Sequence, residues 1–371
     1  MAFHDAAVTL PTQVGLPGAI PVGLPADSTV SAPATTSTLP SQSGARWKRR
    51  GLLGAAAAKR QDAAEMAAYL GYAAAWSAVR KLPERRAYQL FETFADRTWA
   101  KRGPSIIQLE KNLARVCPDA DADQLAALSK ESMRNYLRYW CDAFRMPDWT
   151  RERTVDTFRC ENVELVDELL AEGRGLVIAT THMGNYDHTG AWAAATGRPL
   201  SSVAERLKPT RLFDRFVSYR EELGIRVYPH GTPGVLDSLA TELREQNRVV
   251  ALISDRDMSS YGVPVTFFGH TAKFPPGPAK LALRTGAPLV TATLWYDGPT
   301  AVVHIAPQIA LPPDAPTGED CASQPGYTTA VAEITARIAS ELEVGIAAHP
   351  THWHMLAKLW LDDLPARGSE G

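Results

Sequence analysis

Residues 177–190, VIATTHMGNYDHTG, join an apolar run typical of a buried strand to a segment typical of a helix start. His182 follows the run, and Asp187 comes five residues later. On one continuous helix, residues five apart lie about 140° apart around the axis and do not meet. The two side chains can therefore meet only if His182 precedes the helix and Asp187 lies in its first turns, with Gly184 giving the turn its backbone freedom.

Two interpretations of this pair remain open from the residues alone. In the first, Asp187 holds one ring nitrogen of His182, fixes its tautomer and leaves the other nitrogen as a general base. In the second, the segment is a helix-capping turn that contains a hydrogen-bonded core histidine. The first is typical of open α/β sheets, whose catalytic groups gather where strands end.

The rest of the chain alternates between strand and helix patterns, which predicts an α/β fold with a central, mostly parallel sheet flanked by helices. Further apolar runs lie at 200–204, 249–254, 288–295 and 301–306. Helical patterns lie at 163–170, 190–197, 211–223, 233–246, 277–285 and 326–347. We assign residues 151–365 to this α/β core and residues 366–371 to a short tail.

The N-terminal part of the chain differs in composition from the core. Residues 1–45 are rich in Pro, Gly, Ser and Thr, with Asp5 and Asp27 as their only charges, so we expect a disordered tail. Residues 46–150 are predicted to be helical, and 46–102 hold thirteen Lys or Arg against five Asp or Glu. We expect amphipathic helices that associate with an anionic membrane surface. An ordinary amphipathic helix packed on the core is the alternative.

Composition excludes several classes of protein. The chain has 371 residues, 45% of them hydrophobic, and a formal net charge of −2, which gives no indication of a nucleic-acid partner. Its four cysteines are scattered, as in a reduced compartment. No window reaches the roughly 18 apolar residues of a membrane span. Arg49-Arg50 imitates a twin-arginine export signal but lacks a long apolar core and a convincing cleavage site.

The motifs that other catalytic chemistries require are incomplete or absent in the sequence. A binuclear metal motif aligned on Asp187-His188 needs histidines where the chain has Met183 and Asn185. The group His349, His352 and His354 lacks nearby carboxylate or cysteine partners, so we expect it to line a pocket or pack beside Trp353 rather than bind metal. No G-x-S-x-G, G-x-G-x-x-G or P-loop motif supplies a serine nucleophile or a nucleotide site.

Five blocks together resemble a known family. They are VIATTHMGNYDH, SVAERLKPTRLFDRFVSYREELGIRV, ISDRDMSSYGVPVTFFG, FPPGPAKLALRTGAPL and HPTHWHMLAKLWLDDLP. In this order they resemble the lysophospholipid acyltransferase superfamily, which has a glycerol-3-phosphate acyltransferase-like fold. Within it they resemble the lauroyl (lipid A biosynthesis) acyltransferase branch, and most of all its members that act on phosphatidylinositol mannoside. The resemblance covers roughly residues 63–365.

The resemblance implies a reaction and a location. A fatty acyl group passes from acyl-CoA, a donor substrate rather than a cofactor, to a mannose hydroxyl of phosphatidylinositol mannoside, without a covalent enzyme intermediate. His182 would be the general base and Asp187 its orienting carboxylate, with no metal. The protein would lie peripherally on the cytoplasmic face of the cell membrane. A lauroyl-type enzyme that uses acyl carrier protein on another glycolipid, and a non-catalytic lipid-binding relative, remain as alternatives.

Cationic side chains are expected to bind the anionic parts of the substrates. The thioester carbonyl gains negative charge during attack, and CoA carries phosphates, so both call for Arg or Lys donors. Arg206 and Lys208 follow the run at 200–204, and Arg220 lies one helix later. For each of them, a solvated charged helix face is the alternative.

Acidic side chains follow the predicted strands at the same edge. Glu205 ends the run at 200–204, where it can bind a mannose hydroxyl or a neighbouring arginine. Asp255-Arg256-Asp257 follows the run at 249–254. An acidic residue near this place supports catalysis in the family; we choose Asp257, ahead of Asp255, and assign Asp255 and Arg256 to substrate binding. A loop-locking ion pair is the alternative for both carboxylates.

One departure from the superfamily concerns its phosphate-binding block. Other branches carry Glu-Gly-Thr-Arg, which this chain lacks, and Asp255-Arg256-Asp257 stands in its place. The aromatic and proline-rich stretch from Phe267 to Gly277 has two interpretations, an acyl groove or core packing.

Overall fold

The computed structural model describes residues 66, 70–206, 210–257, 259 and 261–364. The predicted tails at 1–45 and 366–371, and Lys208, lie outside this range, as does most of 46–69. The membrane association expected of the helices in 46–150 stays a prediction. The chain divides into two units, residues 1–78 and residues 79–371. In the first unit, residues 70–78 are helical. All that follows concerns the second unit.

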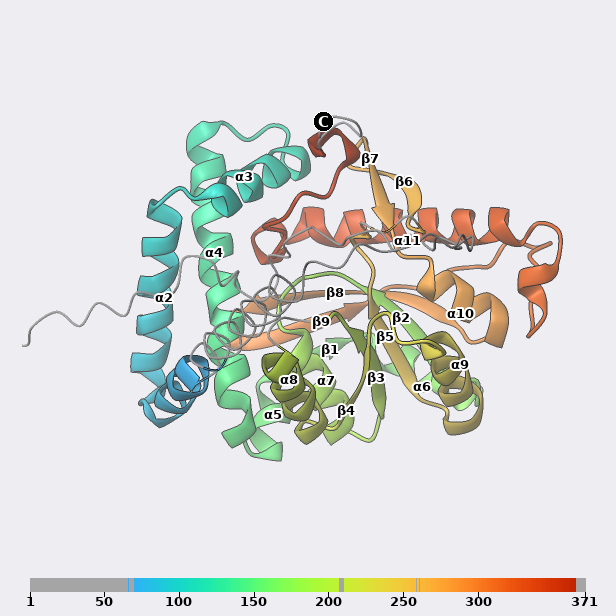
Figure 1. The fold of residues 1–371 in the computed structure, drawn as a ribbon, viewed down its shortest axis with the longest axis horizontal. Coiled ribbons are helices and arrows are strands. Elements are labelled where there is room, and N and C mark those ends of the chain that lie inside the picture. The colour runs from blue at the N-terminus through green and yellow to red at the C-terminus, as the bar shows by residue number, and fades with distance from the viewer. Residues whose placement is uncertain (1–65, 67–69, 207–209, 258, 260, 365–371) are drawn as a thin grey trace, which may run out of the picture. The chain divides into compact units, whose positions relative to one another are not determined.

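A seven-stranded sheet forms the centre of this unit (Figure 1). Its order is β1-β9-β8-β2-β5-β3-β4, which places β2, the strand before His182, in the middle. Among these strands β8 and β9 pair antiparallel, and every other neighbouring pair is parallel. The expected α/β fold with a mostly parallel sheet is confirmed. The strands span β1 Phe158–Glu161, β2 Leu176–Thr180, β3 Leu200–Ala204, β4 Ile225–Pro229, β5 Val249–Ile253, β8 Leu289–Asp297 and β9 Thr300–Ile305.

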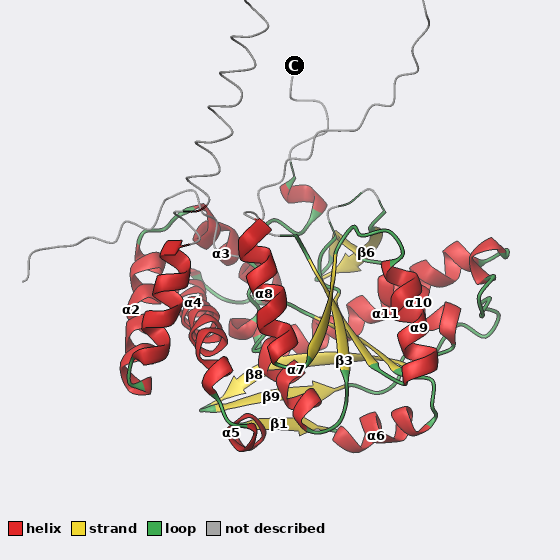
Figure 2. Ribbon diagram, turned by 60° about the horizontal axis from the view of Figure 1, so that its bottom comes forward, coloured by secondary structure: helices red, strands yellow, loops and turns green. Residues whose placement is uncertain are grey.

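Helices cover both faces of the sheet, as Figure 2 shows for α7 and α11. Successive side chains of a strand point to opposite faces. On β8, Ala292 and Leu294 therefore face α7 and α8, whereas Thr293 faces α11, and a Cβ added at Gly345 of α11 would collide with the Thr293 side chain. The helices of the core are α5 Arg151–Asp156, α6 Val163–Ala171, α7 Tyr186–Ala195, α8 Thr210–Glu222, α9 Val235–Gln246, α10 Gly277–Thr285 and α11 Tyr327–Ala348.

Three further helices precede the core: α2 Glu84–Ala100, α3 Pro104–Val116 and α4 Ala122–Arg145. Asp121 and Gln124 form a capping box that starts α4. Two buried amides of these helices hold the C-terminal segment 351–357. Asn112 Nδ2 donates to the carbonyls of Met355 and Ala357 at 2.7 and 3.0 Å, and Asn135 Nδ2 donates to that of Thr351 at 3.1 Å. The helical part is thus tied directly to a segment that reaches the sheet edge.

A small hairpin lies beside the main sheet, formed by β6 Val263–Phe267 and β7 His270–Phe274. Its turn residues Phe268 and Gly269 both have positive φ angles. Phe267 and Phe274 are fully buried, and the Phe267 ring stacks on Trp360 at a centroid distance of 6.1 Å. Of the two interpretations of this aromatic stretch, the structure supports core packing.

Among the helices of the described residues, none combines the length and the apolar character that crossing a lipid bilayer requires.

Candidate active site

The segment 181–185 is a tight turn between β2 and α7, as its spacing predicted. Strand β2 ends at Thr180 and α7 begins at Tyr186, so His182 precedes the helix and Asp187 lies in its first turn. Asn185 caps the helix by accepting the His188 N–H at 2.9 Å. Gly184 has a φ of +53°, and a Cβ there would lie 2.7 Å from the backbone carbon of Leu294. Only glycine lets the turn pass this close to β8.

The carboxylate that contacts His182 is Asp255, not Asp187. His182 Nδ1 lies 2.7 Å from Asp255 Oδ1, and the His182 backbone N–H donates to Oδ2 at 3.0 Å. The pairing follows from strand register, because β2 and β5 are parallel neighbours in which Thr180 pairs with Ile253. Two residues beyond each strand, the same register brings His182 and Asp255 together.

The charge on Asp255 decides the tautomer of His182. Burial raises the pKa of the Asp255 carboxyl, but the charge and hydrogen bonds of His182 and the hydrogen bond of Trp353 together outweigh burial, and the net shift is downward. The ionised carboxylate can only accept, so His182 Nδ1 carries the proton and Nε2 keeps its lone pair. For the His182 imidazole, burial lowers the pKa. The charge of Asp255 and its hydrogen bond raise that pKa by more than burial lowers it, with a smaller contribution from Glu205, so the net shift is upward. The imidazole side chain is 38% exposed and accessible to substrate.

The C-terminal segment 352–354 supports this pair from the other side. Its backbone binds the turn through two hydrogen bonds, Gly184 N–H to the His352 carbonyl at 3.1 Å and His354 N–H to the His182 carbonyl at 2.7 Å. The indole Nε1 of Trp353 donates to Asp255 Oδ2 at 2.9 Å. The turn, the end of β5 and the C-terminal segment therefore meet at the His182–Asp255 pair.

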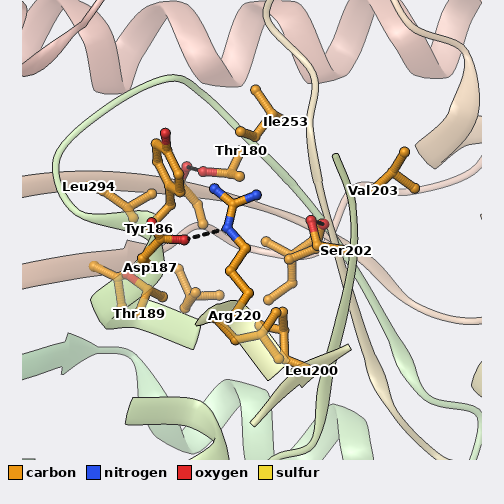
Figure 3. A pocket seen from close by; sticks show the side chains of 16 residues that line it. Thr180, Tyr186, Asp187, Thr189, Leu200, Ser202, Val203, Arg220, Ile253 and Leu294 are labelled. Atoms are coloured by element: carbon orange, nitrogen blue, oxygen red, sulfur yellow. Dashed lines mark hydrogen bonds and ion pairs between the residues drawn. The ribbon is translucent and has the colours of Figure 1, made fainter. Parts of the chain in front are cut away.

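Asp187 has different partners from those expected. Its Oδ1 accepts from Arg220 Nε at 2.7 Å (Figure 3), and its Oδ2 accepts from Tyr139 at 2.8 Å, so each carboxylate oxygen has a donor. Asp187 is almost fully buried. Burial lowers the pKa of the Arg220 guanidinium, but the charge and hydrogen bond of Asp187 together with the neighbouring Tyr139 and Tyr186 raise it more, so the arginine stays charged. The expected hydrogen bond between Asp187 and His182 is replaced by this buried ion pair.

A cavity of about 80 Å³ lies beside this ion pair, between the sheet and helices α7 and α8 (Figure 3). Thr180, two residues before His182, forms part of its wall. Most of the remaining wall is aliphatic and includes Ile178, Leu200, Ile225, Ile253, Leu294 and Val303. The cavity therefore offers an apolar space with one charged pair at its side.

The other predicted site residues lie near the same sheet edge with separate partners. Arg206 is exposed and donates to Thr232 Oγ1 at 2.9 Å. Arg256 is half-buried and donates through Nε to the Lys358 carbonyl at 2.9 Å. Glu205 is exposed, and its charge raises the pKa values of both His182 and Arg256 against the larger, lowering effect of burial.

Asp257, our first choice of supporting acid, occupies a turn two residues beyond Asp255. Its Oδ1 accepts the Ser259 N–H at 2.7 Å, and its own N–H donates to the Lys273 carbonyl at 2.7 Å. These contacts hold the loop after β5. The carboxylate that contacts His182 is instead Asp255, our second choice of supporting acid.

The histidines of the C-terminal segment have packing roles. His349 stacks on Trp295 at a centroid distance of 4.1 Å, and the His354 ring lies 5.3 Å from that of Tyr136. Burial lowers the pKa of His352 to about 4 and that of His354 to about 3, so both are neutral at physiological pH.

Sequence reasoning missed three supporting residues. Tyr139 holds Asp187, Trp353 holds Asp255, and the buried Asp142 accepts from the capping residue Asn185 at 3.3 Å. Tyr139 and Asp142 lie on α4, far away in sequence, where only a helical stripe was visible. Trp353 could have been singled out from the sequence, because it lies between His352 and His354 in one of the five blocks that resemble the family.

Comparisons with known proteins identify the family of this chain. Residues 57–362 match the family model of the bacterial lipid A biosynthesis acyltransferases. A phosphatidylinositol mannoside acyltransferase of Mycolicibacterium smegmatis is 37% identical over 297 residues, covering 80% of this chain and 92% of the relative. One of Mycobacterium tuberculosis H37Rv is 40% identical over 301 residues, covering 79% and 88%. The chain therefore belongs to the bacterial lipid A biosynthesis acyltransferase family.

Proposed function

We propose that this acyltransferase moves a fatty acyl group from acyl-CoA to a mannose hydroxyl of a phosphatidylinositol mannoside. The observation that carries the chemistry is the His182–Asp255 pair, with Nδ1 held at 2.7 Å by a buried carboxylate and the ring accessible to substrate. The names of the relatives support the acceptor. No acyl-enzyme is required, because a positioned base can activate the substrate hydroxyl directly.

In the proposed reaction, His182 Nε2 removes the proton of the mannose hydroxyl as its oxygen attacks the thioester carbonyl. The new C–O bond forms while negative charge collects on the carbonyl oxygen. The C–S bond then breaks, and the thiolate leaves with the proton returned from the imidazolium. Asp255 stabilises the imidazolium between these steps, so it contributes most when His182 is charged.

Arginines at the sheet edge supply positive charge for the anionic groups. We assign the CoA phosphates to the exposed Arg206 and the developing oxyanion to Arg256, which is partly desolvated and so interacts more strongly. Arg220 already neutralises Asp187 through Nε, and we assign its remaining guanidinium N–H groups to the thioester end of the donor. Asp257 stabilises the loop that carries Asp255 and Arg256.

The apolar cavity beside β2 is assigned to the methylene groups of the donor nearest the thioester. At about 80 Å³ it has room for a few methylenes, so a long chain must extend beyond it. Glu205, which directly follows β3, is assigned to a mannose hydroxyl of the acceptor.

The proposed acceptor is a membrane lipid, so we also propose peripheral association with the cytoplasmic face of the cell membrane. Exposed Leu90 and Phe94 on α2, one helical turn apart and near Arg97, support a contact with lipid. Flotation with liposomes tests it: binding should increase with anionic lipid, and equal binding to neutral vesicles would contradict a role for the surplus of Lys and Arg in residues 46–102.

The reaction is tested by mass spectrometry of purified phosphatidylinositol mannoside incubated with enzyme and donor. The wild type should consume acyl-CoA in preference to acyl carrier protein thioester, and His182→Ala should lower kcat about 10⁴-fold while the protein stays folded. Preference for the carrier-protein thioester would overturn the donor assignment. Transfer by His182→Ala at the wild-type rate would overturn the mechanism.

A further inference from the structure

We infer that Trp353 is a positioning residue for acyl transfer, acting through Asp255 by means of its indole N–H. This inference rests on the proposed function, because it assigns Trp353 a part in the chemistry of His182. The Trp353 indole reaches Asp255 from the C-terminal segment, about a hundred residues further along the chain.

The carboxylate of Asp255 is held at both oxygens. Oδ2 accepts two hydrogen bonds, one from the His182 backbone N–H at 3.0 Å and one from Trp353 Nε1 at 2.9 Å. Oδ1 is left facing His182 Nδ1 at 2.7 Å. Without the indole donor, a single hydrogen bond would fix Oδ2, and the carboxylate could rotate away from the imidazole.

The indole itself is enclosed by the fold and packs against two aromatic rings. Trp353 is fully buried, with ring centroids of Phe267 and Trp360 at 6.2 and 6.1 Å. The backbone on either side of it binds the catalytic turn, through the His352 carbonyl and the His354 N–H. Its N–H therefore reaches Asp255 from a rigid frame, which is the arrangement that keeps a reacting group oriented.

Core packing alone would explain a buried tryptophan, and Trp360 provides the matched comparison. It is also fully buried in the same aromatic cluster, and its Nε1 donates to the Phe267 carbonyl at 2.8 Å. The two indoles thus share burial and hydrogen bonding, but only Trp353 donates to the carboxylate that holds His182.

The experiment compares Trp353→Phe with Trp360→Phe in the full-length protein. Both substitutions remove one buried indole hydrogen bond, so both should lower stability similarly. Trp353→Phe should lower kcat about tenfold, the size of one hydrogen bond to a charged group, with KM unchanged. Trp360→Phe should leave kcat within about twofold of wild type, because no charged group of the site loses a donor. Equal losses of kcat in the two variants would overturn the inference.

A double-mutant cycle with Asp255→Ala tests whether Trp353 acts through that carboxylate. Once Asp255 is gone, Trp353→Phe should change the residual rate less than about twofold. The same tenfold loss in both backgrounds would indicate an independent structural role and contradict the inference. If Trp353→Phe does not fold, the benzothiophene analogue of tryptophan, which replaces only the N–H by sulfur, should give the same tenfold loss; wild-type kcat would overturn the inference.

A failure of the proposed function is distinguishable from a failure of this inference. If the wild type transfers no acyl group, the proposed function falls. The His182 ring-nitrogen resonances then decide the inference: they should change in Trp353→Phe and not in Trp360→Phe. Unchanged resonances in Trp353→Phe would contradict a positioning role.

Discussion

Two buried carboxylates lie close to the turn after β2, and they have opposite surroundings. Asp255 accepts from His182 and from the Trp353 indole, both neutral donors when the imidazole is neutral. Asp187 accepts from the permanently charged Arg220 and from Tyr139. Asp255 therefore gains its charged partner only when His182 takes up a proton, whereas Asp187 is neutralised at all times.

From this difference we assign a catalytic role to Asp255 and a stabilising role to Asp187. A carboxylate whose partner becomes positively charged only during the reaction stabilises the protonated form of the base. A carboxylate already paired with arginine has little further stabilisation to offer, but its loss leaves a buried charge uncompensated. The following predictions test this division.

Asp255→Asn should have the largest effect. The amide cannot stabilise imidazolium, and its N–H₂ group facing Nδ1 favours the wrong tautomer, so kcat should fall about 10²- to 10³-fold with little loss of stability. Steady-state kinetics and urea unfolding of the purified variant measure both. A variant that keeps wild-type kcat would remove Asp255 from the mechanism.

Asp187→Asn should mainly affect stability. It leaves Arg220 charged and mostly buried without a counter-ion, so the free energy of unfolding should fall by about 3 kcal/mol. Adding Arg220→Met should recover part of this loss, as measured by urea denaturation. If Asp187→Asn were as stable as wild type yet as inactive as Asp255→Asn, the two carboxylates would have been assigned in reverse.

The pH dependence should show the smallest and most specific effect. A general base works only when deprotonated, and the pKa of His182 is raised above its ordinary value of 6.5, so kcat/KM should reach half its maximum above that pH. In Asp255→Asn the raising partner is lost while burial still lowers the pKa, so the midpoint should move to lower pH. An unchanged midpoint would mean that Asp255 does not act on His182.

Much of this fold was predictable from local pattern. The apolar runs at 200–204, 249–254, 288–295 and 301–306 became β3, β5, β8 and β9 almost residue for residue. Strand β4 was missed because its alternation within Ile225–Pro229 is short and ends in proline. Hairpin β6–β7 was missed because the aromatic residues around Phe267 were weighed as an acyl groove or core, not as strands.

The site was predictable only in part. Spacing within one segment placed His182 before α7 and Asp187 in its first turn, and the structure confirms both. Spacing does not reveal which carboxylate meets the histidine, because that depends on β5 being the neighbour of β2 and on the register of Thr180 with Ile253. Once that register is known, it identifies Asp255 as the partner of His182, whereas Asp257 lies two residues beyond the aligned position.

The central claim is that Asp255, rather than Asp187, fixes the tautomer of His182. Observing that tautomer therefore tests the claim most directly. Nitrogen NMR of isotope-labelled histidine, recorded where the imidazole is neutral and assigned with His182→Ala, reports which ring nitrogen carries the proton. The wild type and Asp187→Asn should both show a protonated Nδ1 and a free Nε2, and Asp255→Asn should lose this preference. A tautomer that changes in Asp187→Asn and persists in Asp255→Asn would contradict the account.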